Sequence, residues 1–463
     1  MIKIAKKFNL FAAFCALLLV GCDKFNQNIA PANQKETFVK YYGHVYSQTT
    51  ADIETVAKDG GYVLFGSTTS YVAAPERGIY NNFYLVKTDT LGNEVWSRSF
   101  GYEPPTTTND LYDNTAQKLI ALPDDGGYIL AGNCQKIELN GGQRIRKQKR
   151  ILLIQLDKDG LEVGRAIQPF SFGDNPDKDW EMRDIKIIPN SELQLAITGT
   201  TTRVNVGKPD YNPQTDLSDV FVARLIDINT IFWQFAYGFG GNDMGVFVAA
   251  RNSSIMVAGR TETKIGNLSI TNDYHVIQFN PTSGGILNQK AFADGRADIF
   301  ASDAAYDTVT QVLTILGNEV ESSGAAGQLT IMQISVPDDR NNTITFLSKL
   351  KTNGSSKNAG AGSMAGNITL LPAEQGFMMT ATSVKVAGVN ADVQLLKFNK
   401  NLELDWDWLF GTGGSIDLAS AVLPLFKPET TDIIGYAMTG TFDLGTNTSI
   451  GLVKTTNSGA LDK

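Results

Sequence analysis

Histidine, the side chain most often used for acid–base catalysis and metal binding, is scarce in this chain of 463 residues. The two histidines, His44 and His275, lie far apart in the sequence. A metal site built from several histidines is therefore excluded, and a serine–histidine–aspartate triad is disfavoured. Both histidines are expected to be structural. The glycines follow a repeat instead of forming a phosphate-binding loop. We therefore assign no metal, no cofactor and no catalytic residue.

Carboxylates are the abundant side chains that could carry acid–base chemistry. An aspartate recurs near the start of one predicted strand in five parts of the chain, at Asp52, Asp184, Asp243, Asp303 and Asp417. Because a catalytic site is unique and these residues recur, we expect them to cap backbone amides at structural corners. A pair of acids that hydrolyses glycosides stays open as an alternative. The segment 157–160 resembles part of a calcium loop but lacks the later acidic ligands, so a hairpin turn is expected there.

The elements that must position these side chains follow a repeat. Its anchor is a small residue that ends an apolar run, at Gly66, Gly132, Gly199, Gly259, Gly317, Ala381 and Gly440, with spacings of 58 to 67 residues. Short segments rich in valine, isoleucine, leucine and aromatic residues, bounded by glycine, asparagine and aspartate, are typical of strands and turns. Each unit predicts four strands, which in the first unit span residues 53–57, 62–67, 83–88 and 95–100.

The two ends of the chain indicate how the repeats are arranged. The last unit lacks an aromatic fourth strand, and Phe38–Gly43 resembles the fourth strand of the first unit, Trp96–Gly101. A solenoid usually has shorter units and needs a cap at each end. We therefore predict an all-β fold, a seven-bladed β-propeller of four-stranded antiparallel blades, closed by an N-terminal strand that completes the last blade.

The repeat motif also points to a broad class of proteins. Gly-Gly-Tyr-x-Leu-x-Gly, followed by Leu-Val-Lys-x-Asp-x-x-Gly-Asn-x-x-Trp, resembles the β-propeller repeats of secreted and surface proteins of bacteria and archaea. The segments 60–101 and 126–173 match best, and the resemblance covers residues 38–463. It implies a binding or scaffolding module more than an enzyme, and it carries over no catalytic residue.

The N-terminus predicts a lipid anchor. Three lysines precede an apolar run, Leu10–Val20, which is too short to span a bilayer and is typical of a signal peptide. The run ends Leu-Val-Gly-Cys at Cys22, which resembles the lipobox of bacterial lipoproteins and implies acylation, including palmitate, on that cysteine. An ordinary signal peptide is the alternative. We expect a signal peptide at 1–21, a lipidated tether at 22–37 and the propeller at 38–463, in the cell envelope, with the outer membrane preferred.

Charge and the remaining cysteine exclude further classes. Loss of residues 1–21 removes three of 40 basic residues and none of 48 acidic ones, which leaves a net charge of −11. Nucleic acid is therefore disfavoured as a partner. The basic cluster Arg144, Arg146, Lys147, Lys149 and Arg150 is expected in a solvated loop, with an anionic partner or lipid headgroups as the alternative. Cys134 is expected to be a small buried hydrophobic residue.

The connections between predicted strands differ in length. Connections between first and second strands, and between third and fourth, are short. Second-to-third and blade-to-blade connections are long and dissimilar, and in an antiparallel blade both emerge on the same face. We expect this long-connection face to bind partners. Its candidate ligand-contacting aromatic residues are Tyr71, Tyr102, Tyr112, Trp180 and Tyr211. For Trp180, packing beneath its own loop is the alternative.

Three functions fit these features. The first is a lipid-anchored binding or scaffold protein of the envelope that holds a glycan, a peptide or a protein partner. The second is a propeller hydrolase or lyase that uses acidic channel residues on polysaccharides. The third is a structural subunit of an envelope complex.

Overall fold

The strands of this protein lie in one contact unit. The structure, a computed structural model, describes residues 36–43, 45–56, 60–70, 80–101, 111–140, 143–168, 178–191, 193–202, 218–238, 241–251, 253–265, 269–292, 297–321, 327–338, 343–354, 362–372, 375–386 and 390–462. Contacts divide the chain into Met1–Glu36 and Thr37–Lys463, and every described strand belongs to the second unit.

The strands form seven sheets of four, named here as blades in chain order. Blade 1 contains β2 (Gln48–Thr55), β3 (Tyr62–Ser70), β4 (Tyr80–Thr88) and β5 (Glu94–Phe100). Blade 2 contains β6 (Leu111–Ala121), β7 (Tyr128–Asn140), β8 (Gln143–Leu156) and β9 (Glu162–Gln168), with the 3₁₀ turn η2 (Pro123–Asp125) after β6. Blade 3 contains β10 (Trp180–Ile187), β11 (Leu195–Thr202), β12 (Ser218–Leu225) and β13 (Ile231–Tyr237). Blade 4 contains β14 (Met244–Ala250), β15 (Ile255–Ile265), β16 (Ser269–Phe279) and β17 (Ile286–Phe292).

The remaining three blades follow the same order. Blade 5 contains β18 (Ala297–Asp307), β19 (Val312–Glu321), β20 (Gln328–Ser335) and β21 (Thr345–Thr352). Blade 6 contains β22 (Gly362–Leu370), β23 (Phe377–Val386), β24 (Asn390–Phe398) and β25 (Leu404–Phe410). Blade 7 contains β26 (Leu418–Phe426), β27 (Ile433–Asp443), β28 (Thr448–Thr456) and β1 (Phe38–Tyr42).

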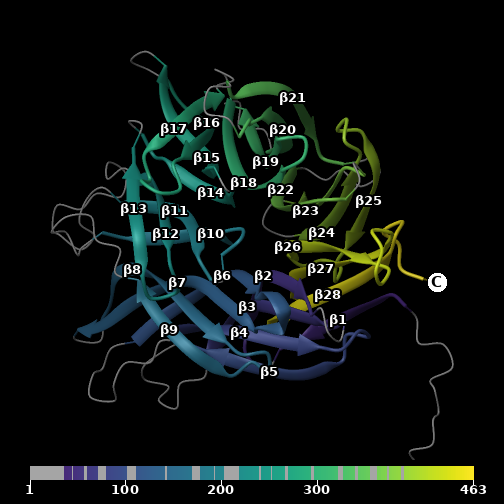
Figure 1. Cartoon of the computed structure of the whole chain (residues 1–463). Helices are drawn as coiled ribbons and strands as arrows, with labels where there is room; N and C mark the ends of the chain where they lie inside the picture. Colours follow the sequence, from purple (N-terminus) through teal and green to yellow (C-terminus); the bar gives the residue numbers. More distant parts are fainter. Residues whose placement is uncertain are drawn as a thin grey trace, which may run out of the picture. The chain divides into compact units, whose positions relative to one another are not determined.

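The predicted seven-bladed β-propeller of antiparallel four-stranded blades is confirmed. The first strand of each blade is innermost, and each innermost strand contacts the innermost strand of the next blade around the whole ring (Figure 1). The closing strand is also where the sequence predicts it. β1 pairs antiparallel with β28, with Phe38 opposite Lys454 and Tyr42 opposite Ile450. The two ends of the chain therefore complete one blade, which removes an exposed sheet edge.

The core is divided among the blade interfaces. Middle strands are buried on both faces, so their sequences read as continuous apolar runs; Val63, Leu64 and Phe65 of β3 are all fully buried. Seven hydrophobic clusters result, one between each pair of neighbouring blades, including one between blades 7 and 1. Each blade is thus held by both neighbours.

Aromatic residues of the outermost strands explain the glycine of the repeat's third-to-fourth turn. Trp96 of blade 1 lies over Gly160 of blade 2, so closely that a Cβ on this glycine would be 2.6 Å from the indole ring. Gly160 also has φ +74°, a left-handed conformation that favours glycine. The same relation joins the closing strand to blade 1, where Phe38 lies over Gly92, and blade 6 to blade 7, where Trp406 lies over Gly459. Tryptophan and glycine therefore belong to one inter-blade contact.

A second regularity was not predicted. The register of every innermost strand shifts at an equivalent point, which marks a β-bulge. The displaced residues are Ala51, Gln117, Arg183, Val246, Ser302, Gly366 with Asn367, and Ser420 with Ala421. A bulge re-aims a side chain and commonly borders a functional site.

Some predicted loops are strands instead. The sequence predicts a solvated loop around the basic cluster of blade 2, but β7 and β8 stay paired as far as Asn140 opposite Gln143. The basic cluster 144–150 therefore lies on β8 and not in a loop. In blade 4, β15 and β16 likewise remain paired to Ile265 opposite Ser269. Continued backbone hydrogen bonding in a two-stranded ribbon outweighs the polar composition that suggested loops.

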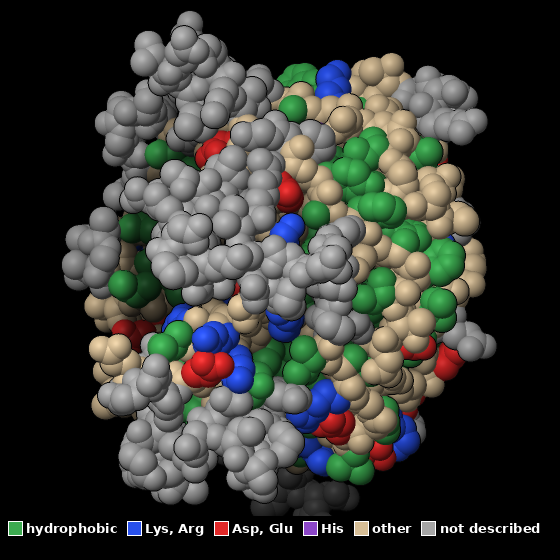
Figure 2. Space-filling model, turned by 90° about the vertical axis from the view of Figure 1, so that its left-hand side faces the viewer, with side chains coloured by type: hydrophobic (Ala, Val, Ile, Leu, Met, Phe, Trp, Pro, Cys, Tyr) green, Lys and Arg blue, Asp and Glu red, His purple; other side chains and the backbone are tan. Residues whose placement is uncertain are grey.

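The outermost strands leave some apolar side chains in solvent. Figure 2 shows one side of the molecule, where hydrophobic side chains stand among polar ones and charged residues of both signs lie together. The exposed apolar residues of these strands and their turns include Leu161, Val163, Phe232, Ile286 and Phe346. Of these, Leu161 and Val163 flank the charged Glu162, whereas Phe232, Ile286 and Phe346 each have an apolar neighbour in the sequence.

Candidate functional site

The structure places Trp180 in the interior. It opens β10, its side chain is 1 % exposed, and its ring packs edge-on against Phe221 with centroids 5.5 Å apart. Both residues belong to the cluster between blades 2 and 3. The packing alternative fits this position, and the surface role proposed for Trp180 does not, because the ring is out of reach of a ligand.

The other aromatic candidates divide into two groups. Tyr112 lies half-buried at the start of β6, where it lines a cavity of about 240 Å³ with Cys134 and Arg150. Tyr71, Tyr102 and Tyr211 lie outside the described residues, as do the lipidation candidate Cys22 and His44.

Cys134 and His275, the two reactive side chains considered in the sequence that the structure describes, are both buried. Cys134 is 2 % exposed, and burial raises the pKa of its thiol to about 12, as suits a small core residue. His275 is 4 % exposed, and burial lowers the pKa of its imidazole to about 4, which keeps it neutral. No group of three or more histidine, cysteine or acidic side chains in the described part of the chain is arranged to hold a metal ion.

The acidic turn at residues 157–160 is a hairpin turn. The Asp157 carboxylate accepts hydrogen bonds from the backbone N–H groups of Asp159 (2.9 Å) and Leu161 (2.8 Å). The side chain thus stabilises its own turn, which agrees with the hairpin that the sequence predicts.

The five recurring aspartates occupy two different positions. Asp417 lies before β26 and accepts from the backbone N–H groups of Thr412 and Asp443, as predicted for a structural corner. Asp243 lies before β14 and accepts from the Thr261 hydroxyl. The other three, Asp52, Asp184 and Asp303, each follow a bulge, and each accepts a backbone N–H from the innermost strand of the next blade, at distances of 2.9 to 3.2 Å. Capping of backbone amides is confirmed for Asp52, Asp184, Asp303 and Asp417, and at the first three of these it also joins neighbouring blades.

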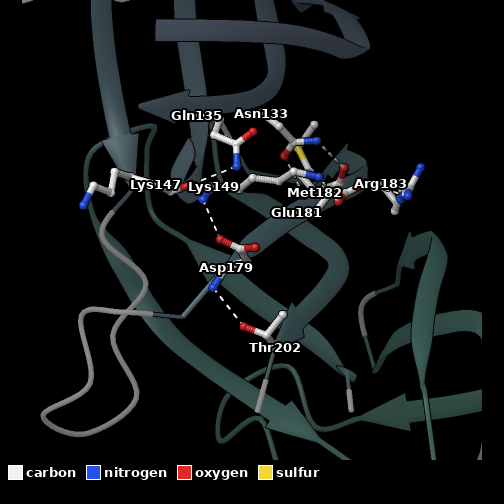
Figure 3. Close-up of polar contacts among 9 residues, drawn as sticks. All are labelled: Asn133, Gln135, Lys147, Lys149, Asp179, Glu181, Met182, Arg183 and Thr202. Carbon is white, nitrogen blue, oxygen red and sulfur yellow. Dashed lines mark hydrogen bonds and ion pairs between the residues drawn. The ribbon is translucent and has the colours of Figure 1, made fainter. Parts of the chain in front are cut away.

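A polar network joins blades 2 and 3 on the long-connection face (Figure 3). The Lys149 backbone N–H donates to the Asp179 carboxylate at 2.7 Å, and its ammonium lies 2.7 Å from Glu181. Arg183 also contacts Glu181, at 2.6 Å. Burial opposes ionisation of Glu181, but Arg183 and Lys149 outweigh it and lower the pKa of this carboxyl group. The predicted basic cluster is therefore partly neutralised, which weakens the case for an anionic partner there.

Arg183 connects this network to a cavity on the propeller axis. The cavity has a volume of about 270 Å³, and every blade contributes its bulge residue to the lining: Ala51, Gln117, Arg183, Val246, Ser302, Gly366 with Asn367, and Ser420. Lys118 and Asp303, which directly follow two of these bulges, also line it. We call this the axial cavity. The bulges thus serve one shared site.

The charges around the axial cavity are strongly coupled. Burial alone would lower the pKa of Lys118, but the carboxylates of Asp303, Asp52, Asp184 and Glu54 outweigh it and raise this pKa. Burial, together with Asp52, raises the pKa of Glu54 to about 7. Burial likewise raises the pKa of Asp303. Lys118 therefore stays a cation in the cavity lining, while Glu54 changes its protonation state near neutral pH.

Two side chains of this lining carry polar groups that lack a partner among the described residues. No described residue accepts a hydrogen bond from the buried Nε of Arg183, and no hydrogen bond of the Gln117 amide is found within the described segments. In contrast, the Ser302 and Ser420 hydroxyls donate to backbone carbonyls of neighbouring blades and hold the ring together. Gln117, Arg183 and Lys118 are thus the side chains best placed to bind an oxygen-rich ligand.

Sequence reasoning missed this set, although a signal was present. Asp52, Lys118 and Asp303 each lie 14 residues before their anchor glycine, and Asp184 lies 15 before its own. A charge at one fixed repeat position in four units indicates a shared location around the axis. The bulge itself leaves no comparable pattern, because the displaced residues share no side-chain type.

Comparisons with known proteins show likeness of fold. No family model matches the chain, and no curated protein matches it. Among solved structures, a Dyadobacter fermentans protein of unknown function is 12% identical, with 92% of this chain and 99% of that chain covered and a TM-score of 0.45. The WD40 domain of Neurospora crassa Pan2 is 10% identical, covers 89% and 91%, and has a TM-score of 0.43. A Bacteroides vulgatus member of the DUF4221 family is 11% identical, covers 75% and 99%, and has a TM-score of 0.37.

These likenesses are distant and extend to no function.

Within the described segments, no helix has the length and apolar character that a membrane span requires.

Proposed function

We propose that this chain is a lipid-anchored binding or scaffold protein of the cell envelope that holds a glycan, a peptide or a protein partner on the long-connection face of its propeller. The observation that carries the proposal is the axial cavity, to which all seven blades contribute a bulge residue. Bulges with a purely structural role need not place their residues around one cavity, whereas the residues of a binding site must lie together. Arg183 and Gln117 supply donors there, and the surrounding ring holds them rigid.

Binding is tested with the purified full chain on glycan arrays and in pull-downs from envelope extracts. Arg183→Ala removes a donor of the axial cavity, while Glu181 keeps its ion pair with Lys149, so the fold should persist. Lys158→Ala, in a tight turn, is the matched control for loss of a cation. We expect the first variant to lose at least tenfold in affinity and the second to bind normally. Equal loss in both variants would argue against the axial cavity.

One observation favours an enzyme as the second candidate. Burial and Asp52 raise the pKa of Glu54 to about 7, and Glu54 lies near Lys118 of the axial cavity; a carboxyl group with such a pKa suits a general acid. A polysaccharide hydrolase would combine such an acid with a second carboxylate. Screening wild type and Glu54→Gln on a panel of polysaccharides decides: hydrolysis that the variant abolishes supports the enzyme, and its absence with retained binding supports the binding protein.

The lipid anchor and the envelope location rest on the N-terminal sequence. Radiolabelled palmitate should enter wild type but not Cys22→Ser. Protease treatment of intact cells should degrade the protein if the propeller faces outward from the outer membrane, and should spare it if the propeller faces the periplasm.

A further inference from the structure

One lysine in the lining of the axial cavity carries a charge to which no described residue is hydrogen-bonded. Lys118 lines the cavity, and no hydrogen bond or ion pair of its ammonium group is found within the described residues. Its nitrogen is also not one of the described polar atoms that are both unpaired and shielded from solvent. Carboxylates of blades 1, 3 and 5 keep Lys118 protonated. An oxygen atom in the cavity can therefore accept a hydrogen bond from this ammonium group.

The lining also offers a second donor and two acceptors. Gln117 precedes Lys118, is half-buried, and makes no side-chain hydrogen bond in the described part of the chain. The Ser302 hydroxyl donates to the Gly366 carbonyl at 2.9 Å, and the Ser420 hydroxyl donates to a carbonyl of blade 1 at 3.0 Å. Each serine has used its single proton, so its oxygen can only accept from a ligand. Hydroxyl groups suit this lining, because they accept from the lysine and the amide and donate to the serines.

Two other cations near the cavity are already paired. Arg183, which lines the cavity, lies 2.6 Å from the Glu181 carboxylate. Lys186, whose charge acts on Asp303 of the lining, lies 3.8 Å from the Asp184 carboxylate. Because each positive charge has a carboxylate beside it, neither is left for an anionic ligand to neutralise.

Lys118 is likewise matched by negative charge. The carboxylates that act on its ammonium group are those of Asp303, Asp52, Asp184 and Glu54. Asp52 alone would balance the lysine, before Asp303 and Glu54 are counted. An anionic ligand would therefore meet no unmatched positive charge, and a cationic ligand would lie against Lys118 itself. An uncharged ligand is favoured over either.

The size and place of the cavity favour the end of a glycan over the end of a peptide. Its 270 Å³ is the share of roughly nine water molecules in the liquid, which is the scale of one sugar unit and below that of a drug-sized ligand. The innermost strands of all seven blades surround it. The end of a peptide carries an ammonium or a carboxylate group, whereas the end of a neutral glycan carries hydroxyl groups only.

We propose that the axial cavity binds one uncharged sugar unit, with Lys118 and Gln117 as donors and the hydroxyl oxygens of Ser302 and Ser420 as acceptors. This inference rests on the function proposed above, and it narrows the ligand from a glycan, a peptide or a protein to a neutral glycan. Acidic sugars should bind more weakly than their neutral counterparts.

Saturation-transfer difference NMR on the full chain in detergent tests this ligand class. The probes are methyl glycosides of glucose, galactose and mannose, each beside the matching methyl glycoside of its uronic acid, in which a carboxylate replaces the terminal CH₂OH group. N-acetylglycinamide represents an uncharged peptide. Gln117→Ala removes one donor, and the fold should persist because this amide makes no hydrogen bond with the described residues. Gln375→Ala, at an exposed position in a tight turn, is the matched control.

We expect at least one neutral glycoside to bind wild type and Gln375→Ala alike, and to lose tenfold or more in affinity in Gln117→Ala. Its uronic acid counterpart should bind wild type at least tenfold more weakly. If circular dichroism shows that Gln117→Ala is unfolded, Gln117→Asn, which withdraws the amide by one methylene group, should show the loss instead.

The contrary outcomes separate this inference from the proposed function. A uronic acid glycoside that binds as tightly as its neutral counterpart, or the peptide amide binding where no glycoside does, would overturn the neutral sugar and leave the axial cavity as a ligand site. Failure of every glycoside to bind would also overturn the neutral sugar. Glycoside binding that the folded Gln117 variant leaves intact would contradict the axial cavity itself.

Discussion

Replacing Gly160 with alanine should destabilise the propeller through the contact between neighbouring blades. Two effects add. At φ +74°, a residue with a Cβ costs about 1 kcal/mol more than glycine. The new Cβ would also lie 2.6 Å from the Trp96 ring, far inside the ~3.5 Å of ordinary carbon contact. Overpacking of this kind typically costs about 1–3 kcal/mol. We therefore expect a total loss of about 3 kcal/mol in the free energy of unfolding.

A matched glycine separates the two effects. Gly413 has φ +75°, but a Cβ there would meet no atom within 4 Å. Gly413→Ala should therefore show the backbone effect alone, about 1 kcal/mol. Both variants, and Gly160→Ala combined with Trp96→Ala, are compared by urea unfolding followed by circular dichroism. In the Trp96→Ala background, Gly160→Ala should cost no more than Gly413→Ala. Equal losses for Gly160→Ala and Gly413→Ala in the wild-type background would refute the role given to Trp96.

Three further predictions concern the closing strand, Glu54 and Cys134. Deletion of residues 36–43 removes β1 and the 2.6 Å hydrogen bond from the Tyr42 hydroxyl to the Gly92 carbonyl. The thermal unfolding midpoint should therefore fall, and aggregation measured by light scattering should rise. An unchanged midpoint would contradict closure of the ring by β1. The pKa of Glu54 is about 7 in the folded chain and about 4.3 in a model peptide, so folding favours its protonated form, and stability should decrease as pH rises from about 5 to 7. Glu54→Gln should therefore be more stable than wild type in urea at pH 8 but not at pH 5, and the reverse order would contradict this pKa. Cys134, buried with a pKa of about 12, should react with a thiol reagent at pH 8 only after denaturation, and rapid reaction of the native chain would contradict its core position.

The fold was predictable because its determinants are local and repeated. The anchor glycines, the turns and the aromatic fourth strands recur in the sequence, and Phe38–Gly43 supplies the strand that the last unit lacks. Each unit alone indicates four strands, and the number of units then predicts the number of blades in the ring. The Gly160 contact also shows that the tryptophan and the glycine of the motif are partners across a blade interface, which spacing within one unit does not reveal.

The candidate site was less predictable because it depends on contacts between units. Lys118, Asp184 and Asp303 come from three blades and meet only when the ring closes. Trp180 follows three charged residues and therefore looked like an exposed loop residue. It is instead the first residue of β10, and its ring packs on Phe221 of β12.

We propose the axial cavity, which a bulge residue of every blade lines, as the ligand site of this propeller. Gln117→Trp tests it most directly, because this bulge residue lines the cavity and makes no hydrogen bond with the described residues. The larger side chain should occupy much of the 270 Å³ while the fold persists. Affinity for the ligand identified on arrays or in pull-downs is then measured for wild type and variant. We expect the folded variant to lose binding, and undiminished affinity in a folded variant would contradict a ligand site in the axial cavity.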